Sequence, residues 1–573
     1  MRIPSATYRV QFNKDFRFEH ARAIVPHLRR LGISHLYASP IFAAREGSTH
    51  GYDVVDPNRL NPVLGSETDF ESLLNDLKSH GMSIILDIVP NHMAASSQNP
   101  WWMDLLENGP ASPFGAFFGV NWGDNASTSK IFLPVLGSPY GFILENQELV
   151  LTYEERGFFI NYWALKLPVD PATYALILDG APPALAPLLE VMERLPDRYA
   201  SEWEAIDTRT REKERIKRDL WALYQEQVAV SEYIDGQLAV YRGRKGDPRS
   251  FGALHVLLER QAYQLAFWKV ATEKINYRRF FDVSDLVGIR VEQATVYEAS
   301  HSLIFQLIEK AAIAGLRVDH VDGLFDPTQY LQRIASKAGY LVVEKILSEN
   351  EGLPEDWPVS GTTGYDFLGH VNALFVDPEG LERVTAFYSE FVGSESTLPD
   401  VEYERKKQVM DQLFTGEMLD LGSDLAELAV TDRYARDLSP KDLRQSLVEI
   451  TACMPVYRTY TNSYAAAERD KEFIQSACAE ARRRNPDLNS AVFDFTQSVL
   501  EEPRDDGRLQ FVMRWQQISG PIMAKGVEDC AFYVYNRLVS LNEVGSIPHP
   551  ITVDEFHAFQ QRRLLKWPHT MSA

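Results

Sequence analysis

The first ninety residues alternate between runs that are typical of strands and runs that are typical of helices. Residues 7–12 and 35–41 are rich in β-branched and aromatic side chains and predict two strands. Residues 19–31 between them predict a helix that ends at Gly32, and Pro26 should kink this helix or delay its start. The order strand, helix, strand is the first sign of an α/β fold.

A capped amphipathic helix and a buried strand follow. Residues 66–69, Ser-Glu-Thr-Asp, resemble a capping box with aspartate in the acidic position. The next apolar positions recur at helical spacing and predict one buried face, made by Phe70, Leu73, Leu74 and Leu77. After Gly81 the continuous apolar run 84–86 predicts a strand that is covered on both sides.

The same rhythm returns in the middle of the chain. Residues 315–319 predict a strand, and a helix follows with Asp326 as its N-cap, Pro327 at its first position and Gly339 at its end. Residues 340–344 predict the next strand. Short connections between these strands and helices imply right-handed βαβ units and a parallel sheet.

Two long segments interrupt this rhythm. Residues 94–290 begin rich in Trp, Pro and Gly and then become helical and charged, and residues 371–510 are mostly helical. Neither segment contains an internal repeat or an unstructured linker, so both are interpreted as excursions from loops of one α/β domain.

Composition narrows the function more than the fold. The chain has 573 residues, of which 45% are hydrophobic and 24% are charged, which is ordinary for a globular protein with a large core. Its formal net charge of -22 disfavours nucleic acid and anionic membranes as partners. A neutral substrate such as a sugar meets no such repulsion.

The cysteines and the apolar runs suggest a compartment. Cys453, Cys478 and Cys530 are odd in number and form no C-x-x-C pair, which argues against a disulfide framework or a zinc cluster. The N-terminus lacks the apolar region of a signal peptide, and no apolar run approaches the ~18 residues of a membrane span. A cytoplasmic location is therefore expected.

Polar residues follow three of the predicted strands, at the edge where a parallel α/β barrel gathers its function. The first group is residues 87–92, Asp-Ile-Val-Pro-Asn-His, which could also be an ordinary strand exit with a helix cap. The second contains Arg317 and Asp319, whose side chains point the same way because side chains alternate along a strand. A neighbouring arginine lowers the pKa of a carboxylate, which suits a nucleophile, although a structural ion pair is equally consistent.

The third strand end supplies a second carboxyl group. Glu344 follows an apolar strand, where burial would raise its pKa and suit a proton donor, or it forms a solvated pair with Lys345. Asp319 and Glu344 are 25 residues apart, about one βαβ unit, which places them on adjacent strand ends. A retaining glycosidase needs two carboxyl groups at ~5–5.5 Å. Tyr52 and Trp101-Trp102 are candidate sugar platforms, although a single aromatic residue is more often part of a core.

At this point the chain resembles a known family. Residues 87–92, 317–320 and 344 match three signature regions of the α-amylase superfamily. Short sequence segments distributed over the whole chain are similar to those of maltooligosyltrehalose synthases. They are residues 7–12, 34–40, 47–53, 87–93, 276–281, 343–347, 361–367, 456–460, 524–529 and 541–545.

The resemblance implies a (β/α)8 TIM barrel of α-amylase type with two large, mostly helical insertions. Residues 1–93 would carry barrel strands one to three, and residues 94–290 would form a subdomain inserted after strand three. Strands four and five would lie in residues 291–370. A helical insertion, 371–510, would contain the sixth strand near 455–461, and residues 511–573 would return to the barrel.

The resemblance also implies the reaction, an intramolecular transglycosylation at the reducing end of an α-1,4-glucan. Asp319 would be the nucleophile and Glu344 the acid and base, while the sugar would be bound by Tyr52, Asp87, Asn91, His92, Arg317 and His320. No metal and no organic cofactor are expected. The implied partners are a maltooligosaccharide or a glucan derived from starch or glycogen, and a maltooligosyltrehalose trehalohydrolase of the same pathway.

One departure from the family pattern changes the expectation. The superfamily has a third carboxylate, an aspartate that follows a histidine after the seventh strand, and no His-Asp dipeptide occurs in this sequence. Asp529 lies in Gly-Val-Glu-Asp and does not match that motif. The chain is therefore expected to end as it enters the seventh strand, with an open sheet edge, weak or no activity and a tendency to aggregate.

Two rival interpretations remain open. The same carboxyl pair fits an α-glucan hydrolase or a 4-α-glucanotransferase on the same barrel. A non-catalytic glucan-binding protein belongs to another class, and the missing His-Asp motif favours it.

Overall fold

The centre of the fold is a parallel sheet of six strands. The structure, a computed structural model, describes residues 3–122, 130–310 and 312–572. The strand order is β1 (Thr7–Val10), β2 (His35–Ala38), β5 (Ser83–Ile88), β14 (Gly315–Val318), β15 (Tyr340–Val343) and β16 (Gly361–Thr362). Every neighbouring pair is parallel, and β1 and β16 form the two edges. This confirms the expected α/β fold with an incomplete barrel.

The register of this sheet separates the face of the main hydrophobic core from a second face that also carries charged side chains. Leu36 pairs with Ile84, and Leu86 pairs with Leu316, and all four side chains belong to the main hydrophobic core. Asp87 pairs with Arg317 on the opposite face. Because partners across a parallel ladder point to the same face, the sheet brings these two charged side chains together.

The first two helices behave largely as their sequences predict. α1 (Phe18–Arg30) packs against α2 (Glu67–Ser79), and α2 also packs on β5. The capping box of α2 is confirmed, because the Ser66 hydroxyl accepts a hydrogen bond from the Asp69 amide and the Asp69 carboxylate accepts one from Ser66. α1 begins at Phe18 with Pro26 inside it, so the start is not delayed, and a kink at Pro26 stays a prediction.

Two further helices connect the later strands. α11 (Ala294–Glu309) precedes β14, and α12 (Pro327–Ala335) lies between β14 and β15. Asp326 caps α12 as expected, with its carboxylate 2.9 Å from the Gln329 amide nitrogen. α12 is shorter than predicted, since it ends at Ala335 and not at Gly339.

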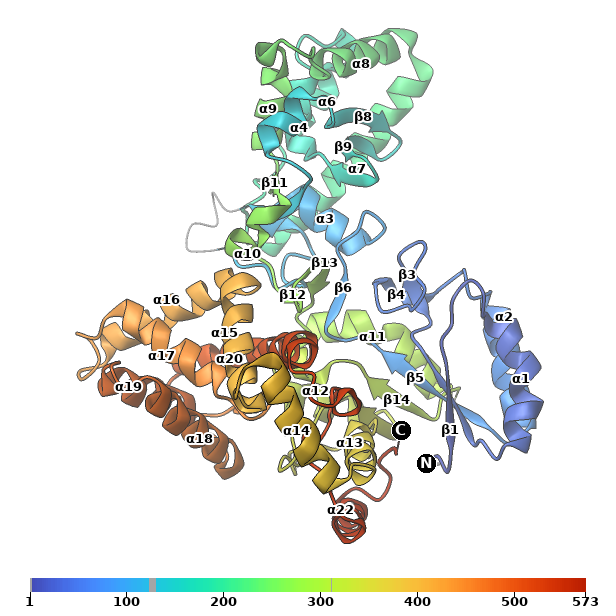
Figure 1. Cartoon of the computed structure of the whole chain (residues 1–573). Coiled ribbons are helices and arrows are strands. Elements are labelled where there is room, and N and C mark those ends of the chain that lie inside the picture. Colours follow the sequence, from blue (N-terminus) through green and yellow to red (C-terminus); the bar gives the residue numbers. More distant parts are fainter. Residues whose placement is uncertain (1–2, 123–129, 311, 573) are drawn as a thin grey trace.

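The first excursion forms a lobe that stands away from the sheet (Figure 1). It leaves the sheet at β6 (His92–Ala94) and returns through β12 (Arg279–Phe280) and β13 (Val283–Gly288), which pair antiparallel with one another and, through β13, with β6. The other elements of the lobe are α3 (Pro100–Asn108), β7 (Ile131–Leu136), α4 (Tyr140–Glu145), β8 (Val150–Glu154), β9 (Gly157–Tyr162), β10 (Leu165–Pro168), α5 (Tyr174–Ile177), α6 (Ala186–Glu193), α7 (Trp203–Glu226), α8 (Val228–Tyr241), α9 (Gly252–Glu259), β11 (Tyr263–Phe267) and α10 (Ala271–Lys274).

Buried ion pairs explain why a strongly charged helix lies inside this lobe. The ammonium groups of Lys213 and Lys217 on α7 each lie 2.8 Å from the Glu107 carboxylate of α3. Burial alone would raise the pKa of Glu107, but these two ammonium groups lower it to about 2. Some of the charged side chains of α7 therefore form buried ion pairs inside the lobe and do not face the solvent.

The second excursion has its own core. Its helices are α14 (Pro378–Val392), α15 (Leu398–Gln412), α16 (Thr415–Thr431), α17 (Pro440–Ala452), α18 (Glu468–Arg484), α19 (Ser490–Glu501) and α20 (Asp506–Met523). α20 continues into a π-helix, η7 (Ala524–Ala531). The core between them includes Phe414, Leu425, Leu447 and Trp515. α13 (Tyr365–Leu374) connects this excursion to the sheet.

The structure corrects the expectation of a sixth strand near residues 455–461. Those residues have no strand structure, and the sixth strand of the sheet is β16, within the range where only strands four and five were expected. In 511–573, the described residues contain no strand and instead form α20, η7, α21 (Phe532–Val534), α22 (Val553–Lys566) and a tail. The Met571 amide of this tail donates to the Thr362 carbonyl at 3.2 Å along the edge of β16. The boundaries between barrel segments and insertions, at residues 93, 290, 370 and 510, remain a proposal.

Candidate functional site

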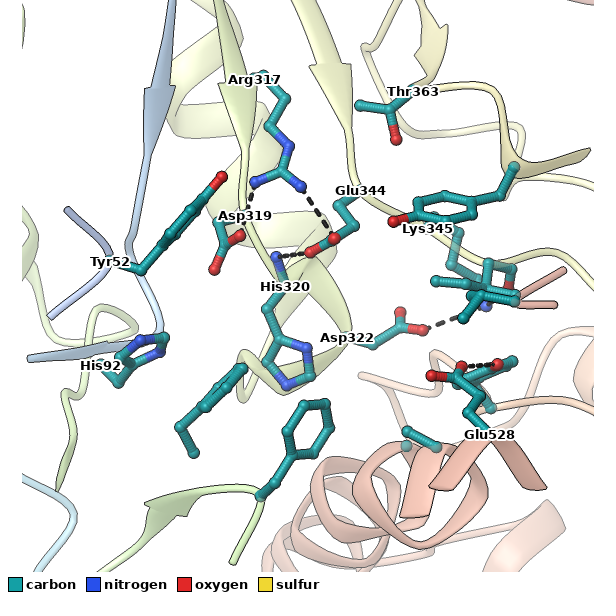
Figure 2. A pocket seen from close by; sticks show the side chains of 18 of the residues that line it. Tyr52, His92, Arg317, Asp319, His320, Asp322, Glu344, Lys345, Thr363 and Glu528 are labelled. Carbon is teal, nitrogen blue, oxygen red and sulfur yellow. Dashed lines mark hydrogen bonds and ion pairs between the residues drawn. The ribbon is translucent and has the colours of Figure 1, made fainter. Parts of the chain in front are cut away.

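A cavity of about 810 Å³ opens where β5, β14 and β15 end. Its walls come from the strand ends, residues 50–52, the β12 region at the base of the first lobe, residues 363–368, segment 455–461, the junction of α20 with η7, and Val544. Asp319 and Glu344 both line it, as do the expected residues Tyr52, His92, Arg317 and His320 (Figure 2).

Arg317 organises the centre of the site. One guanidinium nitrogen lies 2.8 Å from an Asp87 oxygen and 2.6 Å from an Asp319 oxygen. The other terminal nitrogen lies 2.9 Å from a Glu344 oxygen. The second Glu344 oxygen accepts a hydrogen bond from the His320 amide at 2.9 Å. The structure thus brings Asp319 and Glu344 to one guanidinium, as their positions on adjacent strands predict.

The charge balance of this cluster differs from the prediction. Arg317 was expected to lower the pKa of Asp319. In the structure, burial and the negative charge of Glu344 raise the pKa of Asp319 well above its usual value, although Arg317 opposes them. A single guanidinium thus faces three carboxyl groups, those of Asp87, Asp319 and Glu344.

Asp87 and Asn91 support the cavity from behind and do not line it. The Asp87 side chain is 0% exposed, and its oxygens accept from Arg317 and, at 2.6 Å, from the Tyr52 hydroxyl. Asn91 accepts two hydrogen bonds from Arg278, one at its side-chain oxygen at 2.5 Å and one at its carbonyl at 3.1 Å. Direct contact of these two residues with a sugar stays a prediction.

Two neutral histidines and two phenylalanines form an apolar wall. Burial lowers the pKa of His92 to about 3 and the pKa of His320 to about 4, so both rings are neutral near pH 7. The Phe280 ring lies 4.3 Å from His92 and 5.1 Å from His320, measured between ring centroids, and Phe281 lies 5.0 Å from His320. This role of Phe280 and Phe281 was not predicted from the sequence, although both residues belong to segment 276–281, which resembles the known family.

The guanidinium of Arg278 fills a space that exists because position 288 is glycine. Arg278 also donates to the Ile289 carbonyl at 2.7 Å, and a Cβ atom on Gly288 would lie 2.3 Å from its Cζ atom. A Gly288→Ala variant is therefore expected to lower the free energy of unfolding by about 1–3 kcal/mol. Urea denaturation measures this change.

Gly252→Ala is the matched control for that variant. A Cβ atom there meets nothing within 4 Å, at the first residue of α9. Alanine also has the higher helix propensity, so this variant should be neutral or slightly stabilising. Equal unfolding curves for both variants would show that the Arg278 contact does not depend on Gly288.

The far side of the cavity belongs to the second excursion. Glu528 on η7 accepts a hydrogen bond from the Tyr457 hydroxyl, and Gly520 and Ala524 line the same wall. Figure 2 shows Glu528 and Lys345 on one side of the Asp319–Glu344 pair, with Tyr52 and His92 on the other. The contact between Tyr457 and Glu528 depends on tertiary packing and on a π-helical turn, a feature that frequently occurs at functional sites. No local sequence pattern indicates it.

Glu528 should make stability depend on pH. Burial, reinforced by Asp529 and Glu344 and opposed by the Tyr457 hydrogen bond, raises the pKa of Glu528 from 4.5 to about 7. The folded state holds this proton more tightly than the unfolded state does, so the free energy of unfolding falls as pH rises through this window. A Glu528→Gln variant should escape that loss, gaining on the order of 1 kcal/mol over the wild type between pH 5 and pH 8, with solvent screening taken into account.

Chemical denaturation of both proteins at pH 5 and pH 8 tests the expectation. The difference between variant and wild type isolates this one carboxyl group, because all other ionisable groups are shared. A difference that stays constant, or that shrinks as pH rises, would contradict the raised pKa of Glu528.

Within residues 3–122, 130–310 and 312–572, no group of three or more His, Cys, Asp or Glu side chains is arranged to hold a metal ion. None of the helices in those ranges is both long enough and apolar enough to span a bilayer.

Comparisons with known proteins agree with this architecture. The profile of the α-amylase catalytic domain matches residues 24–132. A putative maltooligosyl trehalose synthase of Mycobacterium tuberculosis is 30% identical over 99% of this chain. The structure of a maltooligosyltrehalose synthase from Arthrobacter ramosus superposes with a TM-score of 0.76 at 31% identity, again over 99% of the chain. A hypothetical maltooligosyl trehalose synthase of Sulfolobus tokodaii gives a TM-score of 0.69 at 29% identity over 98%.

The match is nearly complete for this chain and partial for its relatives. The chain spans 62% of the Mycobacterium protein, 62% of the Arthrobacter chain and 61% of the Sulfolobus chain.

Proposed function

We propose that this chain, a homologue of the maltooligosyl trehalose synthases with the α-amylase type of catalytic domain, converts the reducing-end α-1,4 linkage of a maltooligosaccharide into an α,α-1,1 linkage. One observation supports this reaction above all others. Asp319 and Glu344 follow adjacent parallel strands, share the Arg317 guanidinium and line one cavity.

The first step would form a covalent intermediate. An Asp319 oxygen attacks the anomeric carbon of the penultimate glucose, and the bond from that carbon to O4 of the terminal glucose breaks. The bonding electrons go to O4, which takes a proton from the Glu344 carboxyl group. The products are a glycosyl-enzyme, a free terminal glucose and a Glu344 carboxylate.

The second step would reverse these roles with a different hydroxyl. The freed glucose turns, and its anomeric hydroxyl gives its proton to the Glu344 carboxylate. The oxygen attacks the anomeric carbon, and the bond to Asp319 breaks. Two inversions at this carbon restore the α configuration, and no water is consumed.

The two sides of the cavity suggest where each sugar lies. A proton donor stands on the side of the leaving group, so the freed glucose would lie between Glu344 and the wall that carries Lys345, Tyr457 and Glu528. The glucose that forms the intermediate would lie on the side of Tyr52 and His92. The Phe280–Phe281 wall and the neutral histidines would keep water from the intermediate.

Two parts of the proposal rest on the resemblance or on composition. A trehalohydrolase that consumes the product is implied by the family resemblance, and a cytoplasmic location is inferred from the cysteine pattern.

Incubation of the chain with maltopentaose tests the reaction. A non-reducing product of unchanged mass, formed at a low rate because no His-Asp motif supplies the third carboxylate of the superfamily, is the expected result. Shorter reducing sugars would identify a hydrolase, and a ladder of longer and shorter chains would identify a 4-α-glucanotransferase. Binding of maltopentaose without any turnover would identify a glucan-binding protein, and each of these three results would overturn the proposal.

A further inference from the structure

Segment 455–461 crosses from the second excursion to the rim of the sheet without regular structure of its own. It begins after α17 and contributes Tyr457 to the cavity. Tyr457 in turn donates its hydroxyl hydrogen to Glu528. The position of the far wall of the cavity therefore depends on what holds this segment.

Hydrogen bonds fix part of it to the loops that follow β14 and β15. The Arg458 guanidinium donates to the carbonyls of Asp322 at 2.7 Å and Leu324 at 2.6 Å. The Tyr460 hydroxyl donates to the Asp322 carboxylate at 2.5 Å. The Ser348 hydroxyl donates to the Pro455 carbonyl at 2.9 Å.

A chain of buried charges fixes the rest. The Lys345 ammonium lies 3.2 Å from an Asp322 oxygen and 3.2 Å from a Glu351 oxygen, and Figure 2 shows the contact with Asp322. The same Glu351 oxygen lies 2.9 Å from a guanidinium nitrogen of Arg469, which belongs to α18. The other Glu351 oxygen accepts the Ser348 amide at 3.1 Å. The Glu351 side chain is 0% exposed.

Lys345 and Arg469, the two cations that contact Glu351, also lie against aromatic rings of the segment. The Lys345 ammonium lies 5.1 Å from the centre of the Tyr457 ring and 6.0 Å from that of Tyr460. The Arg469 guanidinium lies 5.4 Å from the centre of the Tyr460 ring. Glu351 is thus the shared anion of two cations that together hold the rings of segment 455–461.

The position of Glu351 shows what its removal would do. Lys345 would keep only Asp322 and the Ile346 carbonyl, and a buried cation with fewer partners moves toward water or toward another acceptor. Lys345 lines the cavity, so the nearest space open to it is the cavity itself. Arg469 would lose the carboxylate that joins α18 to the rim of the sheet.

We propose that Glu351 is a positioning residue for the acceptor side of the cavity, holding Tyr457 and Glu528 in place through Lys345 and Arg469. The assignment of that side as the acceptor side rests on the proposed function. A well-placed wall keeps the freed glucose near the glycosyl-enzyme. A loosened wall lets the glucose leave, and water then attacks the intermediate.

A pair of variants in one loop separates this role from a general loss of charge. Glu351→Gln removes the buried anion with little change in shape. Glu349→Gln is the matched control, because Glu349 accepts from His549 at 2.9 Å with its side chain 45% exposed and does not contact segment 455–461. Arg469→Gln, at a side chain that is 26% exposed, is a second and milder variant that breaks the same chain.

The first measurement is the ratio of released glucose to trehalose-ended product from maltopentaose. Glu351→Gln is expected to raise this ratio by roughly tenfold, and Arg469→Gln by less, while Glu349→Gln leaves it unchanged. The rate at which 5-fluoro-α-glucosyl fluoride labels the protein should stay at the wild-type value in all three variants, because this reagent uses only the donor side.

The second measurement is hydrogen–deuterium exchange of peptides that cover 455–461. The Tyr460 amide donates to Asp470 at 2.7 Å and the Thr461 amide to Gln516 at 2.7 Å, so both report on the placement of the segment. Faster exchange there in Glu351→Gln and Arg469→Gln, with unchanged exchange in β14 and β15, supports the positioning role. Wild-type exchange in both variants overturns it.

The two measurements distinguish the two proposals. A wild-type chain that makes no trehalose-ended product overturns the proposed function, while the exchange data still decide whether Glu351 holds the wall. A wild-type chain that makes this product, combined with an unchanged product ratio in Glu351→Gln, overturns the positioning role alone.

Discussion

An Asp319→Asn variant is expected to lose turnover of maltopentaose by on the order of 10⁴-fold or more in kcat. The amide oxygen is a poor nucleophile, so the glycosyl-enzyme cannot form. The substitution keeps the shape of the side chain and removes one of the three carboxyl groups that face Arg317. Binding of maltopentaose should therefore remain, and its Kd by isothermal titration calorimetry is expected to change by less than about threefold, well under one factor of ten or 1.4 kcal/mol.

Asp326→Asn provides the matched control. Asp326 caps α12 with a hydrogen bond to the Gln329 amide, and asparagine caps a helix about as well as aspartate does. This variant should keep wild-type turnover. Turnover in Asp319→Asn that remains within about tenfold of wild type, a difference of only about 1.4 kcal/mol in the barrier, would remove Asp319 from the mechanism.

A Glu344→Gln variant should separate the two roles of that carboxyl group. Without a proton for the leaving oxygen, turnover of maltopentaose is expected to fall by about 10²–10⁴-fold. Fluoride leaves without protonation, so release of the first equivalent of fluoride from α-glucosyl fluoride should stay within about tenfold of wild type. The glutamine also keeps an oxygen that can accept from the His320 amide.

The comparison of the two substrates is the measurement. Stopped-flow fluoride detection gives the first rate, and product analysis of maltopentaose gives the second. An equal loss on both substrates would show that Glu344 does not act as the proton donor and would move that role to another carboxyl group of the cavity.

Much of the central sheet could be predicted because its signals are local. Examples are the apolar run of β5, the capping box of α2 and the Asp326 cap. Each of these signals is formed by residues that lie close together in the sequence. The proximity of Asp319 and Glu344 followed from a single geometric rule, that adjacent parallel strands place their carboxyl ends side by side. These are features in which a short stretch of sequence already determines the structure.

The sixth strand could not be predicted because its stabilising contacts are not local. Residues 455–461 have the β-branched and aromatic side chains of a strand. The amides of Tyr460 and Thr461, however, donate to the side chains of Asp470 and Gln516, and the Tyr460 hydroxyl donates to Asp322. Tertiary contacts override strand propensity there. β16 has only two residues, Gly361 and Thr362, which is too short for any periodic pattern.

The far wall and the charge state of the site were missed for a related reason. Tyr457 and Glu528 are 71 residues apart and meet only through packing and a π-helical turn. The prediction for Asp319 counted one arginine and one carboxylate. The structure brings Asp87 and Glu344 to the same guanidinium, and this excess of negative charge, together with burial, raises the pKa of Asp319.

Trapping of the glycosyl-enzyme tests the central claim most directly. The wild-type chain is incubated with 5-fluoro-α-glucosyl fluoride, whose ring fluorine slows breakdown of the intermediate, and is then analysed by intact-mass spectrometry and peptide mapping. We expect the addition of one fluoroglucosyl group, attached through an ester to Asp319. A chain that binds maltopentaose but takes up no label, or that carries the label on a different carboxyl group, would contradict it.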